Sequence, residues 1–213
     1  MPNLSTSGFF DSYAQDFNAI YGNKNNLLNN LINKLFRKTM KIRFSKTVEG
    51  CCPIDGKNVI DIGCGPGHYS ITLAQKGASH ILGIDFAEGM INHAKKNAEH
   101  AGVLSKCDFV LGDFSTYDFR NGFDYSIIMG FMDYIEKPRD VIEKVLSITK
   151  SKAFFSFPSD RGFLAWQRKL RYKRKCRLFM YNVEQLHELF KDLDYKEIKV
   201  EKLDRDYFVT VFM

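Results

Sequence analysis

Short apolar runs alternate with amphipathic segments along most of the chain. The runs predict strands near five places, namely residues 58–62, 80–84, 108–112, 123–128 and 152–157, with helices between most of them. One such helix is expected over 68–75, where Gly77 provides a C-terminal stop. Runs that are apolar throughout are typical of parallel strands buried on both faces. The pattern therefore predicts a parallel sheet with helices on both sides.

The C-terminal part of the chain follows a different pattern. Asn182 and Gln185 have the spacing of a capping box and predict the start of a helix with one apolar side. Two strand-like segments follow at 195–203 and 206–213, with a short charged turn between them. They predict a final hairpin.

The first predicted strand runs into a glycine-rich turn, VIDIGCGPGHYS, at 59–70. Gly63, Gly65 and Gly67 allow the backbone to bend sharply and to approach a ligand without a Cβ in the way. Unpaired N–H groups at the start of the next helix attract an electronegative ligand edge. His68 stands where a dinucleotide fingerprint has its third glycine, and the Lys-Ser/Thr pair of a phosphate-binding loop is absent. The turn predicts a nucleotide site of another kind, with a ligand-free strand–helix turn as the alternative.

Asp61, two residues before the first glycine, completes a motif E/D-x-G-x-G-x-G, which resembles the first motif of class I S-adenosylmethionine-dependent methyltransferases. Asp85 ends the second strand, 22 residues past Gly63, where doubly wound nucleotide sites place a carboxylate that accepts from both ribose hydroxyls. A helix N-cap is the other interpretation of Asp85. After the third strand, the resemblance implies that Asp113 accepts from the adenine amine and that Phe114 covers the ring. A loop aspartate in a turn is the alternative there.

The resemblance covers about residues 56–213 and implies an α/β fold. We expect a Rossmann-like, seven-stranded, mostly parallel sheet with an antiparallel last strand, helices on both faces, an N-terminal helical lid and a basic insertion after strand five. The FxSFP sequence of the fifth strand, the ending LDRDYFVTVF and the basic insertion are also loosely similar to the magnesium-protoporphyrin O-methyltransferase-like branch, whose substrate bears carboxylates. The expected single domain consists of a lid (1–55), a donor-binding core (56–157), a basic substrate cap (158–181) and a final helix and hairpin (182–213).

The implied methyl donor is S-adenosylmethionine, which leaves as S-adenosylhomocysteine, and no metal is expected. The residues expected to bind the donor lie at or after the strand ends: Asp61, Gly63, Cys64, Gly65, Gly67, Asp85, Phe86, Met90, Gly112, Asp113, Phe114 and Met129. Those expected to bind the acceptor are Tyr13, Tyr21, Phe131 and Trp166. Asp133 and Tyr134 are the expected catalytic residues, because a hydroxyl acceptor needs its proton removed. As alternatives, Tyr134 forms an aromatic wall, Cys64 fills a small-residue slot, and the N-terminal tyrosines belong to the packing face of a helix.

Charge is distributed unevenly along the chain. Residues 24–49 contain seven Lys or Arg and one acid, and residues 161–177 contain eight Lys or Arg and no acid. Together they carry +14, whereas the whole chain carries +6, so the remaining residues sum to −8. Basic segments beside the pocket suit an acidic small-molecule substrate. Aromatic residues interleave with the second run, which is also compatible with a membrane-surface helix, a nucleic-acid contact or a solvated helix face.

Length and composition agree with one compact enzyme. The 213 residues fit a single domain, and a hydrophobic content of 45% supports a sizeable core. The five cysteines are odd in number and lack C-x-x-C spacing, which argues against a disulfide framework or a zinc site. No leader-like or membrane-spanning run is present, so we expect a cytoplasmic protein. The oligomeric state is left open.

Three functions fit these residues. The leading hypothesis is a small-molecule methyltransferase that transfers a methyl group by in-line displacement to an O, N or C atom. The second is an RNA methyltransferase that uses the basic segments for phosphate contacts. The third is a non-catalytic nucleotide-binding module, although such a module has no need of six intact donor-site residues.

Overall fold

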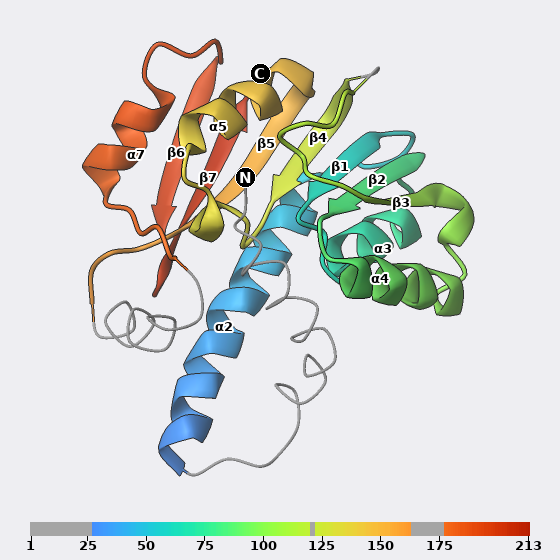
Figure 1. Cartoon of the computed structure of the whole chain (residues 1–213), viewed down its shortest axis with the longest axis horizontal. Coiled ribbons are helices and arrows are strands. Elements are labelled where there is room, and N and C mark those ends of the chain that lie inside the picture. Colours follow the sequence, from blue (N-terminus) through green and yellow to red (C-terminus); the bar gives the residue numbers. More distant parts are fainter. Residues whose placement is uncertain (1–26, 120–121, 163–176) are drawn as a thin grey trace.

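The computed structural model describes residues 27–119, 122–162 and 177–213 (Figure 1). Seven strands form one sheet in the order β3-β2-β1-β4-β5-β7-β6. Their bounds are β1 Asn58–Ile62, β2 His80–Asp85, β3 Cys107–Leu111, β4 Phe123–Ile128, β5 Thr149–Pro158, β6 Glu197–Lys202 and β7 Asp206–Phe212. Strands β1 to β5 pair in parallel, and β7 is antiparallel to both β5 and β6. The predicted Rossmann-like sheet with an antiparallel last strand is confirmed.

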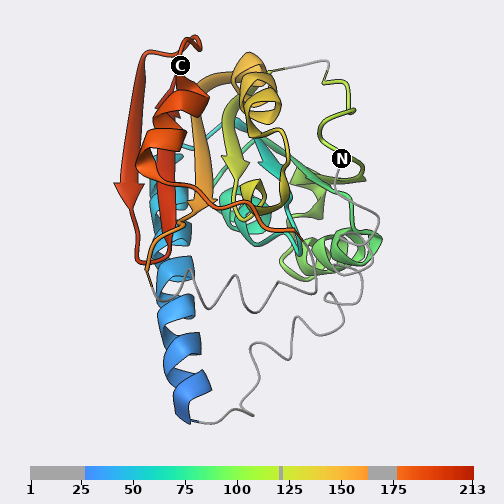
Figure 2. The same cartoon turned by 60° about the vertical axis from the view of Figure 1, so that its left-hand side comes forward.

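Helices cover both faces of the sheet (Figures 1 and 2). They are α2 Leu27–Gly50, α3 His68–Gln75, α4 Glu88–His100, α5 Pro138–Ile148 and α7 Val183–Phe190, with 3-10 turns at Leu104–Lys106 and Met132–Tyr134. One core cluster joins α5 and α7 to the sheet, and a second joins α2, α3 and α4 to it. Consecutive residues of the inner strands, such as Ile127 and Ile128 in β4 or Phe154 and Phe155 in β5, belong to opposite clusters, which is why these strands carry apolar residues on both faces.

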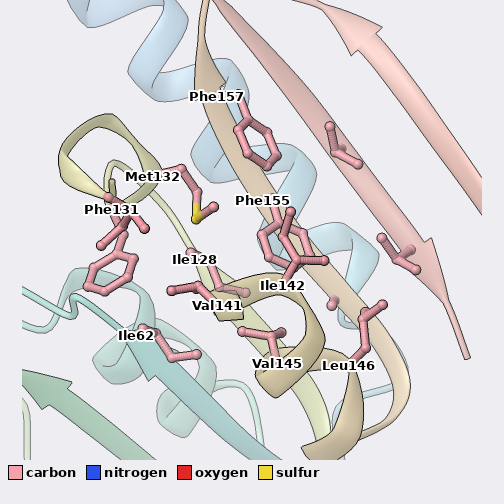
Figure 3. Packing of buried hydrophobic residues seen from close by; sticks show 14 of the residues in the cluster. Ile62, Ile128, Phe131, Met132, Val141, Ile142, Val145, Leu146, Phe155 and Phe157 are labelled. Atoms are coloured by element: carbon pink, nitrogen blue, oxygen red, sulfur yellow. The ribbon is translucent and has the colours of Figure 1, made fainter. Parts of the chain in front are cut away.

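The core under α5 shows how this packing arises. The helix places Val141, Ile142, Val145 and Leu146 along one side, at spacings that repeat with the helical turn. Figure 3 shows these side chains directed toward residues of the strands such as Phe155. The sheet and the helix thus bury their apolar faces against each other, and this fixes where the carboxyl end of each strand lies.

Two predicted helix boundaries are also confirmed. Gly77 follows α3 with a φ of 113°, a conformation that favours glycine. At the start of α7, the Asn182 side chain accepts a hydrogen bond from the Gln185 backbone N–H at 2.8 Å, and the Gln185 side chain accepts from the Asn182 N–H at 3.0 Å. This is the reciprocal arrangement of a capping box.

Among the described residues, no helix is long and apolar enough to cross a membrane. No group of three or more His, Cys, Asp or Glu side chains with the arrangement of a metal site occurs in the same residues. Their four cysteines, Cys51, Cys52, Cys64 and Cys107, are free thiols.

Candidate functional site

The glycine turn lies at the carboxyl end of β1 and is tied to the end of β2. The backbone N–H groups of Gly63 and Cys64 both donate to the Ile84 carbonyl, at 2.9 and 3.1 Å. Gly63, Gly65 and Gly67 all have positive φ, between 53° and 81°, which explains why glycine occupies each position. These bonds hold the turn across the top of the two strands, where α/β proteins bind nucleotides.

The three glycines serve different purposes. A Cβ on Gly63 would lie 2.8 Å from the Phe131 ring, and one on Gly67 would lie 3.2 Å from both Ala94 and Phe109. A Cβ on Gly65 would meet nothing within 4 Å. Gly63 and Gly67 therefore allow close packing, whereas Gly65 leaves the backbone open to a ligand, as a nucleotide cradle requires.

Asp85 holds this cradle in place. One carboxylate oxygen accepts from the Gly65 backbone N–H and the other from the Ala87 N–H, both at 2.9 Å. Ala87, not Asp85, is the N-cap residue of α4, so Asp85 is not the helix cap that the sequence left as an alternative. The side chain joins the end of β2 to the glycine turn. A carboxylate has about four acceptor positions, so these two bonds are compatible with the predicted ribose hydrogen bonds.

Asp61 is buried below the turn. Its carboxylate accepts a hydrogen bond from the Ser70 hydroxyl at 2.7 Å, which links the end of β1 to the first turn of α3. Burial raises the pKa of Asp61 to about 6, the Ser70 hydrogen bonds lower it, and the charge of Asp85 raises it. Two buried carboxylic groups therefore flank the turn, and they give the site a negative character that suits a cationic ligand.

Gly112 and Asp113 follow β3, next to the end of β2. The Gly112 N–H donates to the Asp85 carbonyl at 2.9 Å, so the two strand ends are joined. The Asp113 carboxylate accepts from the Ser115 N–H at 2.8 Å, which shows that the side chain takes part in a turn. Its predicted contact with adenine stays a prediction.

Phe114 differs from its neighbour because it lies in the core. It is 2% exposed and packs against Phe119 and Phe131, with ring centroids 5.3 and 6.5 Å away. The sequence reasoning missed Leu111, which ends β3 opposite Asp85 and is 52% exposed. An exposed leucine at a strand end is an apolar surface available to a flat ring. The signal was present in the sequence, since Leu111 directly precedes the Gly-Asp pair.

The other residues expected at the donor site are mainly buried. Met90 and Met129 are 4% and 8% exposed, whereas Phe86 is partly exposed. Cys64 is also buried, and burial raises the pKa of its thiol well above the ordinary value. This environment agrees with Cys64 as a small core residue, the alternative interpretation from the sequence.

The segment after β4 contains the predicted acceptor-side residues. Phe131 packs between the glycine turn and Phe114, and Asp133 is 4% exposed within the turn Met132–Tyr134. The Asp133 backbone carbonyl accepts from the Phe179 N–H at 2.8 Å. This 3-10 turn is therefore held against the segment that leads into α7. The Asp133 side chain is buried inside the molecule. Tyr13, Tyr21 and Trp166 lie outside the described residues.

Arg43 is a residue of this site that sequence reasoning missed. It belongs to the basic segment 24–49, and its side chain is only 14% exposed. Nη1 donates to the Ser156 hydroxyl at 3.2 Å and to the Asp206 carboxylate at 3.4 Å. The same Ser156 hydroxyl accepts from the Gly130 N–H at 2.8 Å. Arg43 thereby connects α2 to the ends of β4, β5 and β7.

The surroundings of Arg43 stabilise its positive charge. Burial acts to lower its pKa, but the neighbouring Tyr69, Asp206 and Asp133 raise it above the ordinary value. The guanidinium is thus a fixed cation near the buried Asp133 carboxyl. Thr39, Arg43 and Thr47 follow one another at four-residue spacing and are all turned inward, which is the sequence signal that could have identified this residue.

A family model described as a methyltransferase domain matches residues 54–199. The chain belongs to this methyltransferase family. The predicted resemblance to class I S-adenosylmethionine-dependent methyltransferases is confirmed by this match together with the fold, and so is the expected donor of the family.

Relatives with assigned names resemble parts of the chain. A ubiquinone biosynthesis O-methyltransferase of Coxiella burnetii is 31% identical over 125 residues, which are 57% of this chain and 51% of that protein. A Papaver bracteatum protein named probable (S)-tetrahydroprotoberberine N-methyltransferase 2 is 30% identical over 92 residues, 43% of this chain and 25% of its own. The chain thus spans about half or less of the length of these relatives.

Solved structures resemble the whole described fold. Magnesium protoporphyrin IX methyltransferase from Synechocystis PCC 6803, crystallised with S-adenosylmethionine, superposes with a TM-score of 0.74 at 19% identity, covering 97% of this chain and 94% of that one. The putative methyltransferase in a complex with the Haloferax volcanii Trm112 activator gives a TM-score of 0.72 at 15% identity, covering 97% and 96%. At these identities the likeness concerns the fold.

Proposed function

We propose that this protein transfers a methyl group from S-adenosylmethionine to an O, N or C atom of a small, acidic or amphipathic molecule. The observation that carries the proposal is the meeting of Gly65, Asp85 and the Gly112–Asp113 pair at one edge of the sheet, with the buried Asp133 after the neighbouring strand. The first three form a nucleoside cradle. The fourth is a titratable group on the side where an acceptor would enter.

The residues fit the donor in charge, and Gly65 leaves space beside the backbone for it. When bound, S-adenosylmethionine supplies a methyl carbon on a positively charged sulfur, which is electrophilic without further activation. Asp85 accepts from the ribose hydroxyls, Asp113 from the adenine amine, and the open backbone at Gly65 allows close approach. Asp61 and Asp85 add negative charge near the cationic donor. The task of these residues is placement, which can contribute several kcal/mol to the rate by orientation.

The acceptor is proposed to bind beside the segment 129–134. For a hydroxyl acceptor, Asp133 takes the proton while an oxygen lone pair forms the bond to the methyl carbon and the carbon–sulfur bond breaks. A carboxylate acceptor is already ionised and needs no base. Tyr134 is proposed either to form an aromatic wall of the acceptor site or to help Asp133 remove the proton through its hydroxyl. We also propose that the acceptor contacts Tyr13, Tyr21 and Trp166, which lie outside the described residues. The segments 1–55 and 158–181, which are only partly described, are proposed to cover the site.

The named relatives suggest which acceptors to examine. A hydroxylated ubiquinone precursor, magnesium protoporphyrin IX and (S)-tetrahydroprotoberberine are the acceptors to examine, because the names of these proteins point to an O-acceptor, a metalloporphyrin and an N-acceptor. The carboxylates of a porphyrin would suit the basic segments 24–49 and 161–177. The same basic segments keep RNA as the second candidate acceptor.

The first test is binding and transfer with the full chain. Saturating S-adenosylhomocysteine should raise the melting temperature, and lack of stabilisation would leave the non-catalytic interpretation standing. Methyl transfer from radiolabelled S-adenosylmethionine to the three acceptor types would then identify the acceptor class. RNA that binds tightly, with an affinity that falls steeply with salt, would favour the RNA alternative instead.

Asp133→Asn makes the test sharper because it distinguishes kinds of acceptor. With a hydroxyl acceptor, loss of the general base should lower kcat by about 10²–10⁴-fold. With a carboxylate acceptor the same variant should retain most of its activity. Asp140→Asn, an exposed carboxylate on α5, is the control and should match the wild type with either acceptor.

A further inference from the structure

Lys144 of α5 is bound to the turn that follows β3. Its ammonium donates to the backbone carbonyls of Ser115 at 3.0 Å and Tyr117 at 2.7 Å. These carbonyls come about 30 residues before Lys144 in the sequence, so the contact is tertiary. A charged donor makes both bonds stronger than neutral hydrogen bonds.

Aromatic rings complete the binding of Lys144. The ammonium lies 5.2 Å from the centroid of the Phe114 ring and 5.3 Å from that of Phe119. Both distances are within the range of cation–π attraction. Burial lowers the pKa of Lys144, while the charges of Asp113 and Asp118 act to raise it. The side chain is thus held by carbonyls and rings of one segment, 113–119, whose carboxylates favour its charged form.

The same turn is closed from its other side by Asp113. The N–H groups of Thr116 and Tyr117 donate to the Asp113 carbonyl at 3.1 and 3.0 Å, and the Ser115 N–H donates to the Asp113 side chain at 2.8 Å. Asp113 therefore binds the N–H groups of the turn, and Lys144 binds its C=O groups. Both sets of bonds act on the one turn that begins with Asp113.

We propose that Lys144 is a positioning residue for recognition of the donor's adenine. By binding the Ser115 and Tyr117 carbonyls, it holds the Asp113 carboxylate so that one oxygen accepts from the Ser115 N–H and the other accepts from the adenine amine. Lys144 itself lies on α5, remote in sequence from the glycine turn, and its hydrogen bonds go to the turn that follows β3. The proposal rests on the donor site of the proposed function and adds to it a determinant of nucleobase selectivity.

A matched control residue exists beside Lys144. A cavity of about 250 Å³ is lined by Ser115, Tyr134, Lys137 and Lys144, among others. Lys137 precedes α5, is exposed, and takes no part in the contacts with the turn. Lys137→Met and Lys144→Met therefore remove the same charge from the same cavity, but only the second releases the two carbonyls.

The test compares two ligands by calorimetry with the full chain. S-adenosylhomocysteine carries the adenine amine, and S-inosylhomocysteine carries a carbonyl in its place. The wild type should prefer S-adenosylhomocysteine by about tenfold or more, the value of one charged hydrogen bond. Lys144→Met should lose most of this preference, because S-adenosylhomocysteine binding weakens about tenfold while S-inosylhomocysteine binding changes little. Lys137→Met should keep the preference.

Two further measurements separate positioning from a general effect on folding. Amide hydrogen exchange of segment 113–119 should accelerate in Lys144→Met and stay unchanged in Lys137→Met. Lys144→Arg, which keeps the charge and the donors, should restore part of the ligand preference and remains informative if the Met variant does not fold.

The outcomes are distinct. A wild type that binds no S-adenosylhomocysteine overturns the proposed function and this inference with it. A wild type that binds S-adenosylhomocysteine, with a Lys144→Met variant that weakens both ligands equally or neither, overturns the role of Lys144 and leaves the donor site intact. A wild type that binds both ligands equally overturns recognition of the amine by Asp113.

Discussion

Asp61→Asn should make the protein more stable near neutral pH while weakening its donor site. The folded protein raises the pKa of Asp61 from 3.8 to about 6, with burial as the main cause. The folded state therefore binds this proton more tightly than the unfolded chain does. The contribution of Asp61 to the free energy of unfolding consequently falls as the pH rises from about 4 to about 6, and it no longer changes with pH above about 6.

The size of the effect follows from the shift. About two pKa units at 1.36 kcal/mol each correspond to about 3 kcal/mol of lost stability at pH 7.5. Asparagine removes the titrating group, has nearly the same shape, and keeps an oxygen that can accept from the Ser70 hydroxyl. The variant should therefore match the wild type near pH 4 and exceed it by up to about 3 kcal/mol at pH 7.5.

Urea unfolding followed by circular dichroism at pH 4.5, 5.5, 6.5 and 7.5 would measure this difference. Asp194→Asn, at an exposed carboxylate, should change stability little at every pH. A stability difference for Asp61→Asn that stays constant with pH, or that turns in favour of the wild type as the pH rises, would refute the reasoning. The affinity of the variant for S-adenosylmethionine should fall about tenfold, because the negative charge of Asp61 is no longer present to attract the cationic donor.

Three further substitutions examine other parts of the site. Asp85→Ala removes the acceptor of two backbone N–H groups and should weaken S-adenosylhomocysteine binding about 100-fold by calorimetry. Arg43→Met removes one of the two guanidinium groups beside the buried Asp206 carboxylate, the other being that of Arg205, and should cost about 3 kcal/mol in urea unfolding. Lys46→Met, at an exposed ion pair on the same helix, should cost less than about 1 kcal/mol. Gly63→Ala should cost at least about 1 kcal/mol more than Gly56→Ala, because both have positive φ but only the Cβ at Gly63 meets a ring. Equal losses within either of these matched pairs would contradict the packing described.

The sheet was predictable because its determinants are local. Continuous apolar runs identify strands buried on both faces, and the capping box of α7 and the stop at Gly77 depend on residues next to each other in the chain. The glycine turn is equally local, since each of its glycines has the positive φ that the tight turn demands. The antiparallel last strand came from the resemblance, and the structure confirms it.

The strand-end residues predicted for the donor site lie close together in the structure, and their contacts with a ligand stay predictions. Asp85 does not cap α4 but holds the Gly65 and Ala87 N–H groups, which is compatible with the predicted ribose contact. Phe114 was expected over the adenine and lies in the core, because α5 and the 113–119 turn enclose it. Such contacts depend on which segments the fold brings together, and periodicity carries no information about that.

Charge shows the same division between sequence and tertiary structure. The sequence alone established that basic residues gather in 24–49 and 161–177 and that the remainder of the chain has a net negative charge. It could not show that Arg43 turns inward to Ser156 and Asp206, or that Lys144 binds two carbonyls of a distant turn. The sequence by itself determined the strand and helix pattern, the glycine turn and the carboxylates at the strand ends, since neighbouring residues set them. Only the tertiary structure decided which groups hold those carboxylates and where Arg43 and Lys144 bind, because such bonds join residues separated by up to 163 positions and form only when the helices pack on the sheet.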